Sequence, residues 1–452
     1  MNIIIAGIGK VGATLVRQLS AEGHDLTLID LDRSELEDTQ HRHDLMTVEG
    51  NCASMQVLRS AGVESADLLI AVTDADEVNL LSCMTAHGLN PKIHTIARIR
   101  NPEYTQQIYR MRKVFNLSMA VNPERQAAVE LERLLRLPGF LRRDSFAKGR
   151  AEIVELRLDR GSKLSGTSLM DLYRKIGTRV LVCTVLRAGQ VIMPRGDFVL
   201  TEGDRIFVTA PTANLALLLK NLGVHTRRTK SVLIAGGGKV SFYLAQRLTK
   251  AGMDVKLIER DHDRCLELAD LLPEATILEG DCADRADLED MGLLQCDAFL
   301  SLTGVDEMNM ITSLYALSRG VPQVITKLGR TGSTDLADAM NLGSVICPRE
   351  LCGNEIVRYV RAMENQTGAA ISVHAIADGQ AEASEFIVEE QTPGIRTPLK
   401  DLQLRKGALI AIIAHNGRVE IPGGDSQMLP GDTVVVVTPA NAAPQTLNEI
   451  FL

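Results

Sequence analysis

The sequence lacks the long apolar runs that a membrane-spanning helix needs. Its longest runs, such as Ala408 to Ala414, are far shorter than the roughly 18 residues that cross a bilayer. It also lacks an excess of positive charge, because 49 Lys and Arg stand against 57 Asp and Glu, giving a net charge of −8 at pH 7. A protein that holds nucleic acid through phosphate contacts needs the opposite balance, so we expect no nucleic-acid partner.

Cysteine pairs and metal-ligand clusters are also missing. The eight cysteines include no CxxC pair and do not alternate with histidines at zinc spacing, which favours buried thiols in a reducing cytoplasm. His41 and His43 lie two apart on an expected loop, but no cluster of carboxylates or thiols accompanies them. We therefore predict no metal site.

The strongest motif present is the glycine-rich stretch Gly7-Ile8-Gly9-Lys10-Val11-Gly12. An apolar run enters it, an amphipathic helix leaves it, and a second apolar run ends at Asp30, eighteen residues after Gly12. This order of strand, glycine turn, helix, strand and acid is the dinucleotide-binding fingerprint in its required context. The motif predicts a nucleotide site rather than an ordinary turn.

Each part of this motif has a chemical reason. The first glycine permits the tight turn, the second lets a pyrophosphate approach the backbone, and the third lets helix and strand pack closely. The helix N-terminus offers N–H groups to the phosphates. Asp30 can accept hydrogen bonds from ribose hydroxyls and would repel a 2′-phosphate, which favours NAD(H) or an adenine nucleotide over NADP. Lys10 lies in the loop, but no GKS or GKT follows, so P-loop hydrolysis is not indicated.

Short apolar strands alternate with helical stretches through the first 121 residues and predict a parallel sheet covered on both faces. A helix is expected over Glu124 to Leu137, followed by a basic connector over Arg142 to Arg150. From Ala151 the pattern changes to period two, with turn signals between short segments. This predicts a small antiparallel β module, with a helix near Leu169 to Lys175.

The whole pattern then repeats. A shift of 229 residues maps Gly7, Gly9, Lys10 and Asp30 onto Gly236, Gly238, Lys239 and Glu259, and a shift of 230 maps Thr73, Glu77 and Asn79 onto Thr303, Glu307 and Asn309. The β module recurs at a shift of 228, which places Gly189 and Asp204 on Gly417 and Asp432. The chain is therefore interpreted as a tandem duplication of a Rossmann unit followed by a small β unit.

The length of 452 residues fits several domains. The predicted fold class is α/β, with two Rossmann-like doubly wound parallel sheets, each followed by a small α+β module. The predicted boundaries are 1–122 for the first Rossmann domain, 123–150 for a helix and connector, 151–226 for the first small domain, 230–348 for the second Rossmann domain, 349–369 for a connecting helix, and 370–452 for the second small domain.

The duplicated order of glycine motif, Gly50-Asn51-Cys52-Ala53, Ala71-Val72-Thr73-Asp74 and small β module resembles the TrkA family. These are cytoplasmic regulatory subunits of Trk-type bacterial potassium uptake systems, built from tandem RCK (KTN) domains. The resemblance covers essentially the whole chain. It implies peripheral attachment to a membrane-embedded K⁺ channel subunit of the TrkH or TrkG type. It also implies NAD(H) and ATP or ADP in the Rossmann clefts, and assembly into homodimers or tetrameric rings.

The candidate contacts of the first site combine the motif with strand ends. By resemblance Asn51 and Cys52 lie near the adenine, although the family usually has Asp where Asn51 stands. Thr73 is either a phosphate or ribose contact or a turn cap, and Arg98 is either a phosphate clamp or a structural ion pair. The predicted set is Gly7, Ile8, Gly9, Lys10, Val11, Gly12, Asp30, Asn51, Cys52, Thr73 and Arg98.

The second site departs from the first. Ser241 replaces the third glycine, Glu259 has longer reach than Asp30, and Gly304 replaces Asp74. We expect two non-equivalent sites, of which the second binds a different nucleotide, binds more weakly or stands empty. Its predicted residues are Gly236, Gly238, Lys239, Glu259, Asp281, Cys282, Thr303 and Lys327.

Three functions compete: a nucleotide-gated regulatory subunit, an NAD-dependent dehydrogenase, and a nucleotide-binding assembly protein without a channel partner. A dehydrogenase needs a substrate domain with a general acid or base facing the nicotinamide. Each Rossmann unit here is followed only by a short β module with no such group in evidence. The sequence therefore predicts no enzyme, and the resemblance favours the regulatory subunit.

Overall fold

The computed structural model describes residues 1–112, 114–136, 139–158, 161–222, 229–329, 340, 342–364, 370–416 and 418–452. Some predicted features lie outside the described residues: the end of the helix at Leu137, the boundary at 226, the segment 365–369 and the repeated Gly417.

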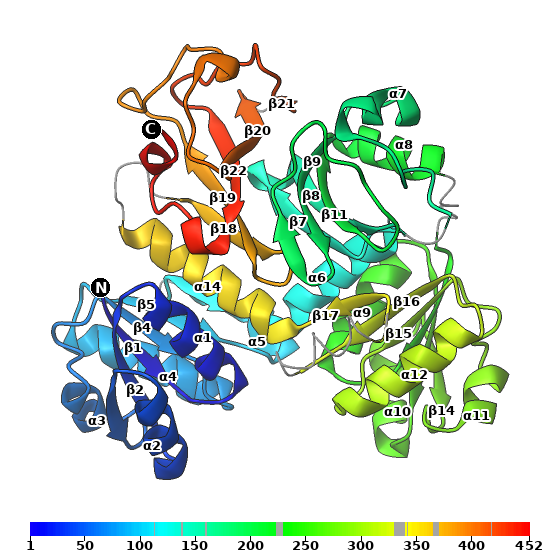
Figure 1. Cartoon of the computed structure of the whole chain (residues 1–452). Coiled ribbons are helices and arrows are strands. Elements are labelled where there is room, and N and C mark those ends of the chain that lie inside the picture. Colours follow the sequence, from blue (N-terminus) through cyan, green and yellow to red (C-terminus); the bar gives the residue numbers. More distant parts are fainter. Residues whose placement is uncertain are drawn as a thin grey trace. The chain divides into compact units, whose positions relative to one another are not determined.

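The first Rossmann domain is a six-stranded parallel sheet in the order β3-β2-β1-β4-β5-β6. Strands β2, β1, β4 and β5 of this sheet are labelled in Figure 1. The order reverses between β1 and β4, which is the switch point where doubly wound folds bind ligands. Its strands are β1 Asn2–Ala6, β2 Asp25–Asp30, β3 Met46–Glu49, β4 Leu68–Ala71, β5 His94–Arg98 and β6 Met119–Val121. Its helices are α1 Lys10–Ala21, α2 Arg33–Arg42, α3 Met55–Ser60, α4 Asp76–Leu89 and α5 Pro102–Met111.

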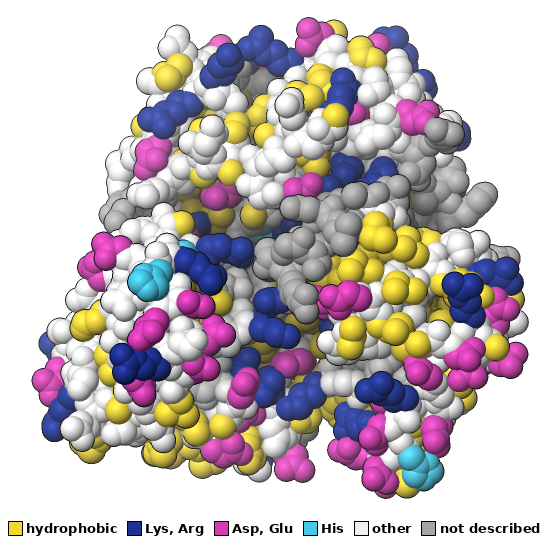
Figure 2. Space-filling model, turned by 60° about the horizontal axis from the view of Figure 1, so that its bottom comes forward, with side chains coloured by type: hydrophobic (Ala, Val, Ile, Leu, Met, Phe, Trp, Pro, Cys, Tyr) yellow, Lys and Arg dark blue, Asp and Glu magenta, His cyan; other side chains and the backbone are white. Residues whose placement is uncertain are grey.

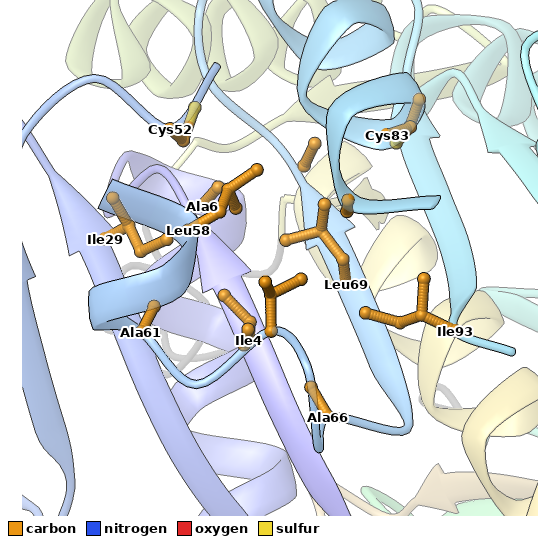
Figure 3. Close-up of a cluster of buried hydrophobic side chains, with 14 of the residues drawn as sticks. Ile4, Ala6, Ile29, Cys52, Leu58, Ala61, Ala66, Leu69, Cys83 and Ile93 are labelled. Atoms are coloured by element: carbon orange, nitrogen blue, oxygen red, sulfur yellow. The ribbon is translucent and has the colours of Figure 1, made fainter. Parts of the chain in front are cut away.

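Continuous apolar strands explain this sheet. β4 is buried at every position, as expected when helices cover both faces. On one face, Ile4 and Leu69 project from neighbouring strands toward Leu58 of α3 and Cys83 of α4 (Figure 3). This core fixes the strand ends from which the predicted site residues emerge.

The second Rossmann domain repeats the first, with the order β14-β13-β12-β15-β16-β17 and parallel pairing throughout. Together the two sheets confirm the predicted fold class. The strands are β12 Ser231–Ala235, β13 Asp254–Glu259, β14 Thr276–Glu279, β15 Ala298–Ser301, β16 Gln323–Lys327 and β17 Ser344–Ile346. The helices are α9 Lys239–Lys250, α10 His262–Leu271, α11 Arg285–Asp290 and α12 Asp306–Ser318.

The two small domains are five-stranded antiparallel sheets in the orders β10-β9-β11-β8-β7 and β18-β19-β22-β20-β21. The first contains β7 Arg142–Phe146, β8 Ala151–Arg157, β9 Leu181–Arg187, β10 Gln190–Ile192, β11 Arg205–Ala210, α7 Leu172–Ile176 and α8 Thr212–Leu222. The second contains β18 Ser372–Ile376, β19 Ala381–Ile387, β20 Leu409–His415, β21 Arg418–Glu420 and β22 Thr433–Pro439.

The predicted connector over Arg142 to Arg150 is wrong in its first half. Arg142–Phe146 forms β7 and pairs with β8. Charged residues fit this strand because they find buried partners: Arg143 donates to Glu152 on β8 through Nε at 3.0 Å and Nη2 at 2.6 Å. A run of basic residues alone does not reveal such partners.

The two small sheets share one apolar core. Ile153 and Phe207 of the first sheet belong to the same buried cluster as Ala383, Ile412 and Val435 of the second. Arg205 also reaches Asp378 at 2.8 and 3.0 Å. Each sheet has a further core on its other face, which explains why β8 and β11 are buried almost throughout.

By their contacts the described residues form two compact units. The first contains Met1–Ala128 together with Cys347–Tyr359, and the second contains most of the rest. Helix α14, Pro348–Glu364, follows the second Rossmann sheet in sequence, yet its first turns pack on α1 within the first unit. There Gln18 Nε2 donates to Asn354 Oδ1 at 2.8 Å.

Helix α6, Pro123–Arg136, follows the first Rossmann sheet in sequence, yet its later residues pack within the second unit. Its residues from Val129 onward belong to the second unit, where Arg247 Nε of α9 donates to Glu132 at 2.6 Å and Gln323 donates to the Leu134 carbonyl at 3.0 Å. Each half of the chain therefore supplies a helix to the Rossmann domain of the other half.

The surface carries both signs of charge. Figure 2 shows Asp and Glu side chains interspersed with Lys and Arg over the face it displays. Among the described residues, no helix combines the length and the hydropathy needed to span a membrane.

Candidate nucleotide site

The glycine loop joins β1 to α1, and two of its glycines are required by close packing. Gly7 has a φ of +101°, and a Cβ added there would lie 2.8 Å from the Thr73 amide nitrogen. A Cβ at Gly12 would lie 1.9 Å from the Gly7 carbonyl oxygen. These contacts bring the loop against the end of β4 and hold α1 tightly on the loop.

Gly9 differs from both. It is the N-cap of α1 with a φ of −53°, which any residue can adopt. A Cβ added there would meet no described atom within 4 Å. The protein fold therefore does not require glycine at this position, whereas a pyrophosphate lying against the first turn of α1 would.

Asp30 lies beside the loop, as the fingerprint predicts. Its Oδ2 accepts a hydrogen bond from the Ile8 amide at 2.6 Å, and its Oδ1 accepts one from Asp32 at 3.0 Å. The carboxylate is therefore fixed at the carboxyl end of β2 next to the glycines. Asp32 itself is the N-cap of α2 and accepts a hydrogen bond from the Ser34 amide at 3.0 Å.

Thr73 is held by a residue for which the sequence suggested no role. Asn79 Oδ1 accepts from the Thr73 amide at 2.9 Å and from the Thr73 hydroxyl at 2.7 Å, while Asn79 Nδ2 donates to the carbonyls of Thr73 and Arg98 at 3.1 and 2.9 Å. Asn309 makes the same four bonds with Thr303 and Lys327. The recurrence of Asn79 as Asn309 in the repeat was the available signal for this positioning role.

Arg98 is buried at the end of β5. Its Nη2 donates to the Thr73 carbonyl at 2.7 Å and to Asp74 Oδ1 at 2.8 Å. The structural ion pair is thus present in this structure, although Asp74 is almost fully exposed. A role for Arg98 as a phosphate clamp stays a prediction.

Asn51 and Cys52 follow β3, next to the end of β2. Asn51 Oδ1 accepts from the Ala53 amide at 2.9 Å, and Asp281 makes the same turn with Ala283. The Cys52 side chain packs in the core (Figure 3), where burial raises the pKa of its thiol. Any nucleotide contact at Cys52 would therefore be made by its backbone atoms. Cys282, at the matching position of the second repeat, is only half-buried.

The second glycine loop repeats this geometry with one coupled change. Glu259 Oε2 accepts from the Gly237 amide at 2.7 Å, as Asp30 does from Ile8. A Cβ at Gly237 would lie 2.9 Å from that oxygen and 2.6 Å from Leu268. The longer acid therefore needs glycine where the first loop carries Ile8.

The remaining predicted residues lie at the loops and the strand ends. Lys10 and Lys239 are exposed in the first turns of α1 and α9, and Val11 packs in the core. A Cβ at Gly236 would approach the Thr303 Cα to 2.9 Å, whereas Gly238 is as open as Gly9. Lys327 Nζ donates to the Leu302 carbonyl at 3.0 Å.

The histidine positions are corrected in part. His41 lies in the last turn of α2 rather than on a loop, and His43 is the C-cap of that helix. Within the described ranges, no three His, Cys, Asp or Glu side chains gather closely enough to hold a metal.

This fold and these loops define a tandem of Rossmann-type nucleotide-binding domains, each with its own small β domain. The TrkA-N domain family matches residues 3–123 and 232–348, and the TrkA-C domain family matches 153–223 and 383–450. The chain belongs to the TrkA family.

Relatives of similar length support this membership. The Trk system potassium uptake protein TrkA homolog of Archaeoglobus fulgidus is 34% identical over 436 residues, covering 96% of this chain and 97% of that protein. The Trk system potassium uptake protein TrkA of Halomonas elongata is 31% identical over 443 residues, covering 96% and 95%. These relatives carry the name of an uptake protein and not of an enzyme, in agreement with the prediction against catalysis.

Solved structures support the fold. The crystal structure of the GsuK RCK domain matches with a TM-score of 0.62 at 17% identity, covering 97% of this chain and 92% of that chain. The GsuK channel bound to NAD matches with a TM-score of 0.60 at 18% identity, covering 97% and 77%.

Proposed function

We propose that this protein is a cytoplasmic regulatory subunit of a Trk-type potassium uptake system. It binds NAD(H) and ATP or ADP in its Rossmann clefts and converts the nucleotide state into gating of a membrane K⁺ channel subunit of the TrkH or TrkG type. It attaches peripherally to the inner face of the membrane and assembles as a homodimer or a tetrameric ring. Full-length similarity to potassium uptake proteins supports this function.

The observation that carries nucleotide binding is the open space above Gly9 beside the fixed Asp30 carboxylate. Phosphates placed there would accept hydrogen bonds from the first N–H groups of α1, and Asp30 would accept from ribose hydroxyls. Arg98 lies at the end of β5, and Asn79 joins it to Thr73 through their carbonyls. A terminal phosphate that drew Arg98 from Asp74 would give ATP and NAD(H) different effects on this edge of the sheet.

Gating requires that the nucleotides bind two conformations with different affinities. The Arg98–Asp74 pair offers one such difference, because Asp74 is exposed and can release the guanidinium to a phosphate. The second cleft has Gly304 in place of Asp74 and Lys327 in place of Arg98. We therefore place the regulatory exchange in the first cleft.

The test is calorimetric titration of the purified full-length protein with NADH, NAD⁺, ADP and ATP, beside its sedimentation profile. Gly9→Val should fold, because its Cβ meets no neighbour, and should abolish binding at the first cleft. Gly238→Val is the matched control, equally open in the second cleft, and should leave first-site binding unchanged. Asp30→Ala should weaken binding by up to about 3 kcal/mol, the scale of a lost charge-assisted hydrogen bond.

Competing saturable binding with a change in sedimentation and no NADH consumption would support the switch. Nucleotide-dependent K⁺ flux through the channel subunit in liposomes would then support the partner. Unchanged nucleotide affinities in Gly9→Val and Asp30→Ala would show that the nucleotide does not bind at this site. Oxidation of NADH without a conformational response would favour a dehydrogenase.

A further inference from the structure

A cavity of about 230 Å³ lies beside α1 and is lined by cationic side chains from three helices or their ends. Lys10 and Arg17 come from α1, Arg42 and His43 from the end of α2, and Arg349 from the first turn of α14. None of the described residues that line it is acidic. Four formal positive charges and a histidine therefore gather in one place, in a chain whose net charge is −8.

Arg349 is fixed over this cavity without a complete set of partners. Its Nη2 nitrogen is buried and has no hydrogen-bond partner among the described residues. One turn later, Gly353 packs so closely on α1 that an added Cβ would lie 2.7 Å from Gln18 Oε1 and 3.1 Å from a Thr14 carbon. Positions 349 and 353 share a face of α14, so this contact places Arg349 on the side of α14 that faces α1.

Arg42 is only weakly engaged by its ion-pair partner. Arg42 approaches Asp38 only to 3.9 Å, and both side chains are mostly exposed. A buried guanidinium nitrogen without an acceptor costs free energy, which an anionic oxygen would recover. The cavity is therefore set up for an anion.

The second Rossmann domain shows that the fold does not require this arrangement. At a shift of 229 residues, Ala13 and Thr14 correspond to Phe242 and Tyr243. These two side chains are buried and pack edge to face, with 5.4 Å between their ring centroids. The same shift turns Arg17, Arg42 and His43 into Gln246, Leu271 and Leu272. Apart from Lys10, which Lys239 repeats, the first repeat thus carries small residues and ionisable side chains where the second carries aromatic, aliphatic or amide side chains.

We propose that this basic pocket binds a small phosphate anion of the pyrophosphate class. Its volume lies below the roughly 300–1,000 Å³ of pockets that enclose a whole drug-sized ligand, so it does not enclose a whole dinucleotide. Guanidinium groups recognise phosphate oxygens bidentately, and three of them converge here. The pocket runs along the side of α1, whereas the N–H groups of the glycine loop lie at its end.

Two sources of the phosphate are distinguishable, because Lys10 belongs both to the glycine loop and to the pocket. A free anion binds when the glycine loop is blocked. The terminal phosphates of a nucleotide do not enter the pocket in that case, because the nucleotide can no longer bind to the loop. The proposal commits to the free anion and does not depend on nucleotide binding.

The experiment is calorimetric titration of full-length Gly9→Val protein with inorganic pyrophosphate at fixed ionic strength. In that background, Arg17→Gln and Arg42→Gln should each weaken binding about tenfold, as expected for a lost charge-assisted contact. Ala13→Phe, which introduces the side chain of the second repeat without changing charge, should abolish binding. Arg33→Gln is the matched charge control on α2, where Arg33 pairs with Glu37 outside the pocket, and should bind like its parent.

Three results would overturn the proposal. The first is the absence of saturable pyrophosphate binding in both the unmodified and the Gly9→Val proteins. The second is binding that Gly9→Val abolishes, which would assign the anion to the glycine loop. The third is an equal loss in Arg33→Gln and Arg17→Gln, which would indicate only a general charge effect. Should Ala13→Phe not fold, the two arginine variants still decide the question.

Discussion

At the scale of single residues, the two repeats differ at one helix position that packs against the glycine loop. In the first repeat a Cβ at Gly12 would collide with the Gly7 carbonyl oxygen, so only glycine fits. In the second repeat Ser241 occupies the matching position, fully buried, and its hydroxyl has no partner among the described residues. The substitution was readable from the sequence, but the unpaired hydroxyl was not, because hydrogen-bond satisfaction depends on neighbours in space.

Ser241→Ala should raise the free energy of unfolding by about 1 kcal/mol, because it removes a buried hydroxyl without a hydrogen bond. Ser313→Ala is the matched control in the same domain: Ser313 accepts from Thr326 Oγ1 at 2.7 Å, so its removal should destabilise by a similar amount. Denaturant unfolding measures both. Destabilisation by both variants would show that Ser241 has a partner.

At the scale of elements, helix α6 carries two glutamates with opposite titration behaviour. Burial raises the pKa of Glu130 to about 7, only partly opposed by Arg133. Burial also acts on Glu132, but there the hydrogen bonds from Arg136 and Arg247 outweigh it and lower the pKa. The sequence placed this helix correctly, yet it did not distinguish the two acids, because their environments come from β7 and α9.

Stability should therefore fall between about pH 5 and pH 7 through Glu130. The folded state keeps a proton there that the unfolded state has lost, so unfolding becomes easier as pH rises. Glu130→Gln should remove this pH dependence, which amounts to up to about 3 kcal/mol in the free energy of unfolding across the interval. Glu132→Gln should instead lower stability near pH 7, since the contribution of Glu132 is present above its unfolded pKa and is lost as pH falls. Unfolding curves across pH 4.5–8 test both, and an unchanged slope in Glu130→Gln would contradict the argument.

At the scale of the whole molecule, the duplication supplies two small sheets that pack on each other within one chain. The small sheets share a core containing Ile153, Phe207 and Val435, and polar contacts cross the same junction, such as Ala147 N to Glu385 at 3.0 Å. Neither sheet buries this face by itself. The sequence did not show what covers this face of each small sheet, because alternation marks a buried face without identifying the surface that packs on it.

A half chain of residues 1–222 should therefore self-associate, because it exposes the apolar face around Phe207 that the second sheet covers. Light scattering after size-exclusion chromatography should show a dimer or larger species. Phe207→Asp in the half chain should disfavour that association, while Arg33→Gln should not change it. A half chain that is monomeric at every concentration would argue against a required partner face.

The sequence by itself determined the features that short stretches of consecutive residues specify. The glycine motif, the acid at Asp30 and the nearly constant shift between repeats specified two Rossmann sheets and the glycine loops at their carboxyl edges, since each signal spans a few consecutive residues. Tertiary structure decided the rest: strand β7, the pairing of the small sheets, the exchange of α6 and α14, and the placement of Arg349 beside α1. These features join residues up to hundreds of positions apart, and no periodicity within a segment encodes which distant surface will cover its buried face.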